Sequence, residues 1–280
     1  MLPVKKIWMM KRLLTLLACV AVSVTASAQS VVLVGTQLQV TGTDQLDSVT
    51  ISRFDGDLIA VIANDTDFVF DVFLEEEVTD LVVNLGDGDD IYNALDSVVP
   101  AVVNGEAGDD LIFASMGDDR ITGGDGDDTI FGYNGDDNIN GNDGDDYIDA
   151  GGDIDIVRGD DGRDVLVGGA GLDQVIGGDG QDILVGGELD ADALAFSGII
   201  ETWTFGADDT FDARVADVLN ASPVLYNDFE LDFISGGKEA DLFFDQADEI
   251  IVDGVSWPQT AGHSGGGRVD VVIDALATAH

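Results

Sequence analysis

An aliphatic side chain recurs at every ninth position between residues 105 and 185, without a break in register. These residues are Ile112, Ile121, Ile130, Ile139, Ile148, Val157, Leu166, Val175 and Leu184. An aspartate lies two positions before each of them, so the sixth position of the nine-residue unit is always acidic. The fourth position is glycine except at Asp153, and the first is glycine or alanine. A fixed period with these constraints predicts a repeat architecture in which each unit stacks on its neighbours.

Each unit divides into a strand and a turn. Three residues centred on the eighth position are expected to be extended, with one side chain inward, while the glycine-rich first six form a turn that needs positive φ angles. One buried aliphatic side chain contributes roughly 1.5–3 kcal/mol, against about 1–2 kcal/mol of backbone entropy for each ordered residue. Stacking also places the turn aspartates about 4.8 Å apart, where their charges repel. We therefore expect a cation between successive turns.

The available ligands indicate that this cation is calcium. The turns offer aspartate carboxylates and backbone carbonyls, the hard oxygen ligands that calcium accepts in flexible geometry. Zinc and copper prefer sulfur or imidazole, and the one cysteine and two histidines of the chain lie outside the repeats. Magnesium fits poorly because it demands octahedral geometry and retains its waters. The sequence therefore predicts several calcium ions as the cofactor.

The unit Gly123-Gly124-Asp125-Gly126-Asp127-Asp128-Thr129-Ile130-Phe131 resembles the calcium-binding nonapeptide repeat of the hemolysin-type (RTX) family, G-G-x-G-x-D-x-U-x. The resemblance implies an all-β fold, a parallel β-roll (β-solenoid) in which two units make one coil. It also implies that calcium lies between turns of adjacent coils on the same edge, which pairs Asp110 with Asp128 and Asp119 with Asp137. A disordered linker rich in glycine and aspartate is the alternative, and the aliphatic residues at one phase argue against it.

The candidate calcium ligands are the sixth-position aspartates, including that of an isolated unit before the array, and the glycines at the first position. The aspartates are Asp90, Asp110, Asp119, Asp128, Asp137, Asp146, Asp155, Asp164, Asp173 and Asp182, and the glycines are Gly105, Gly123, Gly132, Gly141, Gly159, Gly168 and Gly177.

The chain before the array is predicted to hold an export signal and a cap. Residues 1–28 combine basic residues with the apolar run Leu13–Val24 and an Ala26-Ser27-Ala28 cleavage site, a pattern typical of a signal peptide. Residues 29–84 alternate short β-rich stretches with polar turns, which predicts a β-rich N-terminal cap with degenerate repeats. One degenerate repeat is residues 42–50, with aspartate at the sixth position and valine at the eighth.

The β-roll itself is predicted to span residues 85–187, with residues 94–104 forming a calcium-free coil. Residues 188–226 are expected to be an insertion that contains a short helix at Asp208–Leu219, because its apolar residues share one helical face. Residues 227–280 contain two degenerate units followed by strand-like stretches. They predict a C-terminal cap, since the ends of a solenoid need covering.

Composition restricts the possible partners. A formal net charge of −45 and a pI near 4.1 exclude nucleic acid and anionic membranes as natural partners. The apolar run in the signal is too short to span a bilayer comfortably, so no transmembrane segment is predicted. The mature chain from residue 29 onward contains no cysteine, and disulfides therefore cannot stabilise it outside the cell.

One enzyme motif occurs, at Gly262-His263-Ser264-Gly265-Gly266. This G-x-S-x-G motif lacks the preceding strand, following helix and suitably placed later histidine of a nucleophile elbow. We therefore expect a secreted, non-enzymatic calcium-binding protein that folds on binding calcium after export and serves as a cell-surface, matrix or adhesion component. The alternative is the repeat portion of an RTX-type exoenzyme or toxin. An ice-binding or carbohydrate-binding solenoid is disfavoured, because the ninth position carries no regular threonine or aromatic array.

Overall fold

The computed structural model describes residues 29–54, 57–64, 68–189, 225–226, 232–237, 241–245, 250–251 and 271–274. Apart from one 3-10 turn, η1 (Glu75–Glu77), the regular elements in these ranges are strands. They are β1 (Ser30–Val34), β2 (Gln37–Thr43), β3 (Asp47–Phe54), β4 (Asp57–Asn64), β5 (Phe68–Leu74), β6 (Asp80–Asp87), β7 (Ile91–Asn93), β8 (Ala101–Ala107), β9 (Leu111–Phe113), β10 (Arg120–Asp125), β11 (Thr129–Asn134), β12 (Asn138–Asp143), β13 (Tyr147–Gly152), β14 (Ile156–Asp161), β15 (Val165–Ala170), β16 (Gln174–Asp179), β17 (Ile183–Val185), β18 (Glu188–Leu189), β19 (Leu225–Tyr226), β20 (Phe233–Gly237), β21 (Leu242–Asp245), β22 (Ile250–Ile251) and β23 (Val271–Asp274).

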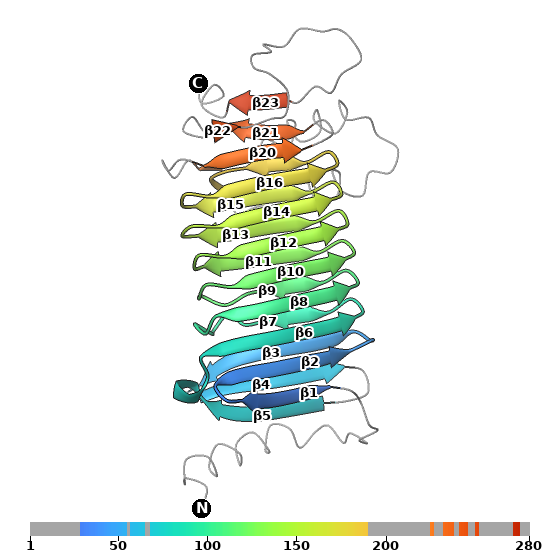
Figure 1. The fold of residues 1–280 in the computed structure, drawn as a ribbon, viewed down its shortest axis with the longest axis vertical. Coiled ribbons are helices and arrows are strands. Elements are labelled where there is room, and N and C mark those ends of the chain that lie inside the picture. Colours follow the sequence, from blue (N-terminus) through green and yellow to red (C-terminus); the bar gives the residue numbers. More distant parts are fainter. Residues whose placement is uncertain are drawn as a thin grey trace, which may run out of the picture.

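The strands wind into a stack of coils, in which consecutive strands from β6 to β17 alternate between two sheets (Figure 1). The first sheet, which we call sheet A, has the order β1-β2-β6-β8-β10-β12-β14-β16-β20-β22. The second, sheet B, has the order β23-β21-β17-β15-β13-β11-β9-β7-β3-β4-β5. Equivalent residues of adjacent coils pair in parallel at a separation of two units, as in Ile121 with Ile139 and Ile130 with Ile148. The all-β parallel β-roll is thus confirmed.

Most strands of the array are longer than the sequence analysis predicted. Strands β10 to β16 each contain six residues, which occupy positions seven to nine of one unit and one to three of the next. Only positions four to six remain as the turn. The prediction of three-residue strands was therefore wrong for β10 to β16, because positions two and three of the next unit continue the pairing with the neighbouring coil, as Gly124 does with Asn142 and Asp125 with Asp143. Positive φ angles occur within these strands at position two as well as in the turns at position four, as at Gly124 and Gly126.

The core of the array is a narrow column of side chains. In each array strand the eighth-position aliphatic residue is fully buried, and the first-position residue beside it is glycine or alanine. The N-terminal coils bury more, because two or three alternate residues of each strand are apolar, as at Leu38 and Val40 in β2 or Leu81, Val83 and Leu85 in β6. These residues and the array column form one continuous core.

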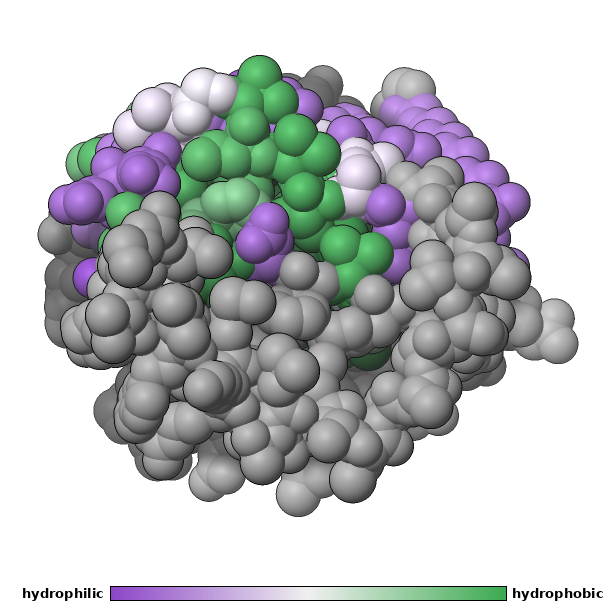
Figure 2. Space-filling view, turned by 90° about the horizontal axis from the view of Figure 1, so that it is seen from below, coloured by the Kyte–Doolittle hydropathy of each residue, from purple (hydrophilic) through white to green (hydrophobic). Residues whose placement is uncertain are grey.

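The N-terminal end is closed by antiparallel strands. Strand β4 pairs with β3 and β5, while β1 pairs with β2. Seen from this end, apolar surface gathers beside hydrophilic surface that continues along the flank (Figure 2). Val32 and Val34 of β1 are exposed there. The predicted N-terminal cap therefore consists of antiparallel strands added to the parallel coils.

The degenerate units after the array join the same stack. Strand β20 pairs with β16, and β21 pairs with β17, in parallel and in register with the array. Strands β18 and β19 pair with each other and mark the two ends of the predicted insertion. Its predicted helix, Asp208–Leu219, lies outside the described residues, as does the predicted signal peptide. Within the described ranges, no helix has the length and apolar character needed to cross a membrane.

Candidate metal sites

The sixth-position aspartates form two rows along the roll, one at each edge. Row A lies in the turns that come directly after strands of sheet A, and row B lies in the turns after strands of sheet B. Row A contains Asp47, Asp90, Asp110, Asp128, Asp146, Asp164, Asp182 and Asp241, and row B contains Asp119, Asp137, Asp155, Asp173 and Asp232, all of them buried. The pairing of Asp110 with Asp128 and of Asp119 with Asp137 is thus confirmed. Sequence analysis did not assign Asp47, Asp232 and Asp241 to the rows, although each stands at the sixth position of a degenerate unit.

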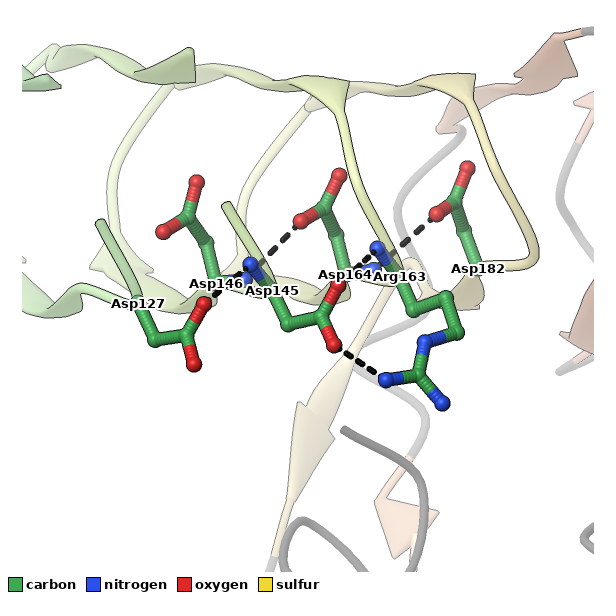
Figure 3. A network of polar contacts seen from close by, with 6 residues as sticks. All are labelled: Asp127, Asp145, Asp146, Arg163, Asp164 and Asp182. Carbon is green, nitrogen blue, oxygen red and sulfur yellow. Dashed lines mark hydrogen bonds and ion pairs between the residues drawn. The ribbon is translucent and has the colours of Figure 1, made fainter. Parts of the chain in front are cut away.

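One oxygen of each carboxylate links adjacent coils. The backbone N–H of Asp146 donates to Oδ1 of Asp164 at 2.9 Å, and that of Asp164 donates to Oδ1 of Asp182 at 3.0 Å (Figure 3). The same bond runs along row B, from the N–H of Asp119 to Asp137 and from Asp137 to Asp155, each at 2.8 Å. Each row is therefore a ladder in which every turn is tied to the next.

The second carboxylate oxygen, Oδ2, is buried and lacks a hydrogen-bond partner in much of both rows. This holds for Asp90, Asp110, Asp128, Asp137, Asp146, Asp155 and Asp164. A buried anionic oxygen without a donor is costly. These aspartates therefore need a proton or a cation at Oδ2.

The space beside Oδ2 is framed by carbonyl oxygens. A Cβ atom on Gly105 would collide with both Asp110 Oδ2 and the carbonyl oxygen of Gly123 in the next coil. On the other edge, a Cβ on Gly168 would lie 2.5 Å from the carbonyl oxygen of Gly186 and 3.0 Å from Asp173 Oδ2. Two acceptors thus face the same small volume, which glycine leaves open. This arrangement suits a hard cation bound by carboxylate and carbonyl oxygens.

Burial makes the ionised aspartates unfavourable when no metal is bound. Desolvation, followed by the charges of neighbouring aspartates, raises the pKa of Asp128 to about 8 and that of Asp137 to about 9, although a backbone hydrogen bond to each carboxylate opposes the shift. Burial likewise raises the pKa of Asp164, with the charge of Asp182 as the next cause. Asp119 differs, because hydrogen bonds from Ala101 and Ser115 oppose the desolvation and hold its pKa to about 6.

Side chains alone do not complete a metal site. Among the residues that the structure describes, no three histidine, cysteine, aspartate or glutamate side chains converge on one point. The first-position glycines that sequence analysis selected, such as Gly105 and Gly168, lie beside the turn aspartates of their own units. They provide open space and carbonyl groups. The arrangement therefore requires an ion that accepts backbone carbonyls, which calcium does and zinc does not.

A second column of aspartates, at position five, lies outside row A. The N–H of Asp145 donates to Oδ1 of Asp127 at 2.8 Å, and the N–H of Arg163 donates to Oδ1 of Asp145 at 2.9 Å. The guanidinium of Arg163 also contacts Asp145 Oδ2 at 2.5 Å (Figure 3). These bonds run in the opposite direction to those of row A. This column was not predicted from the sequence, although the repeated Asp-Asp pair at positions five and six indicates it.

The array is similar in sequence to a known calcium-binding repeat, which agrees with the geometry of the two rows. Residues 102–130, 122–157 and 158–190 match the profile of the RTX calcium-binding nonapeptide repeat (4 copies). No curated protein and no solved structure matches the chain significantly. The array therefore binds calcium at multiple sites.

Proposed function

Residues 102–190 are RTX calcium-binding nonapeptide repeats, and from this we propose that the protein is a secreted, non-enzymatic β-roll that folds when it binds calcium after export. One observation carries the proposal: the turn aspartates are buried in two rows with Oδ2 atoms that have no partner. Binding to sites that exist only in the folded chain adds its free energy to folding. Calcium concentration would then control the folded population.

We assign the ions to the turns of both rows. The proposed ligands are the aspartates from Asp90 to Asp182 selected from the sequence, together with carbonyl groups next to the first-position glycines. Each ion would bridge consecutive turns, because the carboxylate of one coil and the carbonyl of the next face the same volume. Asp119 is an exception among them, because Ser115 donates hydrogen bonds to its Oδ2.

The extracellular location rests on the chain's own residues. The signal-like pattern of residues 1–28 supports export, and calcium is abundant outside cells. A role in a cell surface, a matrix or adhesion fits an acidic β-roll whose folded form depends on calcium. The G-x-S-x-G motif at residues 262–266 lies outside the described residues, and its sequence context supports a non-enzymatic reading.

Calcium binding and folding can be measured together on the mature chain. We expect equilibrium dialysis at millimolar calcium to give several ions per chain, and circular dichroism to change from coil to β structure. Sodium at matched ionic strength should recover much less β structure, because screening does not coordinate Oδ2. Fewer than two ions per chain would reject the proposal. Binding of the protein to cells with and without a chelator tests the surface role separately.

A further inference from the structure

Asp119, the first aspartate of row B, differs from Asp137 and Asp155 because both of its carboxylate oxygens accept hydrogen bonds. Ser115 N–H donates to Oδ2 at 2.8 Å, and the Ser115 hydroxyl lies 2.9 Å from Oδ1 and 3.0 Å from Oδ2. Ala101 N–H donates to Oδ1 at 2.6 Å. In contrast, Asp137 accepts one backbone bond at Oδ1 and has no partner at Oδ2. Neutral donors of the chain thus surround the Asp119 carboxylate.

Asp47, the first aspartate of row A, shows the same arrangement at a distant point in the sequence. Thr43 N–H donates to Oδ2 at 2.5 Å, and the Thr43 hydroxyl contacts Oδ2 at 2.9 Å. The Gln29 side-chain amide donates to Oδ1. Thr43 and Ser115 both occupy the second position of their units, four residues before the aspartate. The aspartate at the N-terminal end of each row therefore accepts hydrogen bonds at both carboxylate oxygens, and we call this arrangement a closure.

The backbone of these two turns also differs from that of the others. From Gly86 to Gly178, every second-position residue except Ser115 has a positive φ angle, including four that are not glycine. Those four are Glu106, Tyr133, Asn142 and Asp160, with φ between 75° and 84°. Thr43 and Ser115 have no positive φ, nor do the fourth-position residues Gln45 and Gly117. In the two turns without positive φ, the N–H of the second-position residue points at Oδ2 of the turn aspartate.

We propose that Thr43 and Ser115 close the two rows with hydrogen bonds in place of a cation, so that Asp47 and Asp119 are not calcium ligands. This inference rests on the proposed calcium sites and sets where they begin. An N–H aimed at Oδ2 presents a positive hydrogen where the ion would bind, and the two would repel. A carboxylate that accepts several hydrogen bonds remains stable as an anion without a counter-ion.

The two aspartates stand where the rows begin. Before Asp119, the corresponding turn is the loop of residues 94–100, and Ala101 donates to Asp119 Oδ1 where the other turns of row B have an aspartate N–H. Before Asp47, no further parallel coil exists in the described chain, because β1 pairs antiparallel with β2. The first aspartate of each row therefore has no preceding turn aspartate, and a hydroxyl residue four positions before it supplies hydrogen bonds.

The proposal is tested by counting ions in matched variants of the purified protein. Asp137→Asn and Asp90→Asn should each lower the number of bound calcium ions by at least one in equilibrium dialysis. Asp119→Asn and Asp47→Asn should retain the number bound by the unmodified protein. Loss of ions in Asp119→Asn equal to that in Asp137→Asn would overturn the proposal. An unmodified protein that binds no calcium would instead reject the proposed function itself.

A second pair of variants decides the question if the asparagine variants do not fold. Ser115→Ala and Thr43→Val remove the hydroxyl and keep the backbone. Thr43→Val should lower the melting temperature equally with and without calcium, and Ser115→Ala should lower it equally at every calcium concentration that keeps the array folded, up to saturation, because no ion replaces the lost bond. If Asp119 and Asp47 bind calcium, saturation should remove the difference from the unmodified protein. That result would overturn the proposal without reference to the asparagine variants.

Discussion

The N-terminal coils and the central array share one winding but bury different groups. In the N-terminal coils, β4 contributes Leu58, Ala60 and Ile62 to the core, and the neighbouring strands contribute two or three apolar residues each. In the array each strand contributes one large aliphatic side chain to the continuous core, while the adjacent turns bury aspartates. Apolar burial of roughly 25 cal/mol per Å² therefore favours the first region much more than the second. The same topology can be held by a hydrophobic core or by bound ions.

The negative charge of the array increases the difference in stability between the array and the N-terminal coils. Residues 105–185 carry 22 acidic and three basic side chains, a net charge of −19. The aspartates at the start of each row accept hydrogen bonds from Thr43 and Ser115, whereas the Oδ2 atoms of Asp110, Asp128, Asp137, Asp146, Asp155 and Asp164 have no donor. We therefore regard residues 29–93 as a base whose folding is independent of calcium. On this view the array extends from the base only when ions neutralise its rows.

Removal of calcium should have the largest effect and should be confined to one region. In a chelator, amides of residues 105–185 should exchange with deuterium at the rates of an unfolded chain, because their carboxylates repel and few apolar contacts oppose them. Amides of β2, β3, β4 and β6 should remain protected. Hydrogen exchange followed by mass spectrometry resolves the two regions. Equal loss of protection in both would show that the base also depends on calcium.

The sequence predicted the array better than its boundaries, for physical reasons. The nine-residue period gave the positions that face the core, and the resemblance to the RTX repeat, with two units in each coil, gave the register of Ile121 with Ile139. It did not give the strand length, since glycine is usually read as a turn residue. It also did not separate Asp119 from Asp137, because both stand at the sixth position. The difference depends on the hydrogen bonds of Ser115, which are visible only in the folded chain.

Acidification should partly replace calcium in the array. The metal-free fold raises the pKa of Asp128 to about 8 and that of Asp137 to about 9, above the value near 4 of an unfolded chain. A raised pKa means that the folded state binds more protons, so its stability is greatest below about pH 4 and falls as pH rises from there to about 8–9. After removal of calcium by dialysis, circular dichroism should show more β structure at pH 5 than at pH 9. With calcium bound the trend should reverse, because protons compete for the carboxylates. No pH dependence without calcium would contradict the burial of ionised aspartates.

A pair of core substitutions should separate the two regions by their calcium dependence. Leu58→Ala in β4 and Ile148→Ala in β13 each remove a fully buried side chain, at a cost of about 2–5 kcal/mol. Leu58→Ala should lower the free energy of unfolding with and without calcium. Ile148→Ala should lower it only when calcium is present, since the array is otherwise unfolded. Urea titrations with and without calcium measure these free energies of unfolding. A calcium-independent effect of Ile148→Ala would show that the array, like the base, is folded without calcium.

The smallest effect is expected at the outer column of aspartates, where Arg163 supplies a counter-charge to Asp145. The two side chains are 27% and 21% exposed and 2.5 Å apart, so solvent screens the pair and its contribution should be below about 1 kcal/mol. Arg163→Gln should lower the stability of the calcium-bound array by this amount at low salt, and the difference should shrink at high salt. Arg158→Gln is the matched control, because it makes the same change in charge at a guanidinium that donates to Asn138 at 3.3 Å. If both variants lose equal stability, the effect comes from the total charge of the array. If only Arg163→Gln does, the contact with Asp145 supports the array alongside calcium.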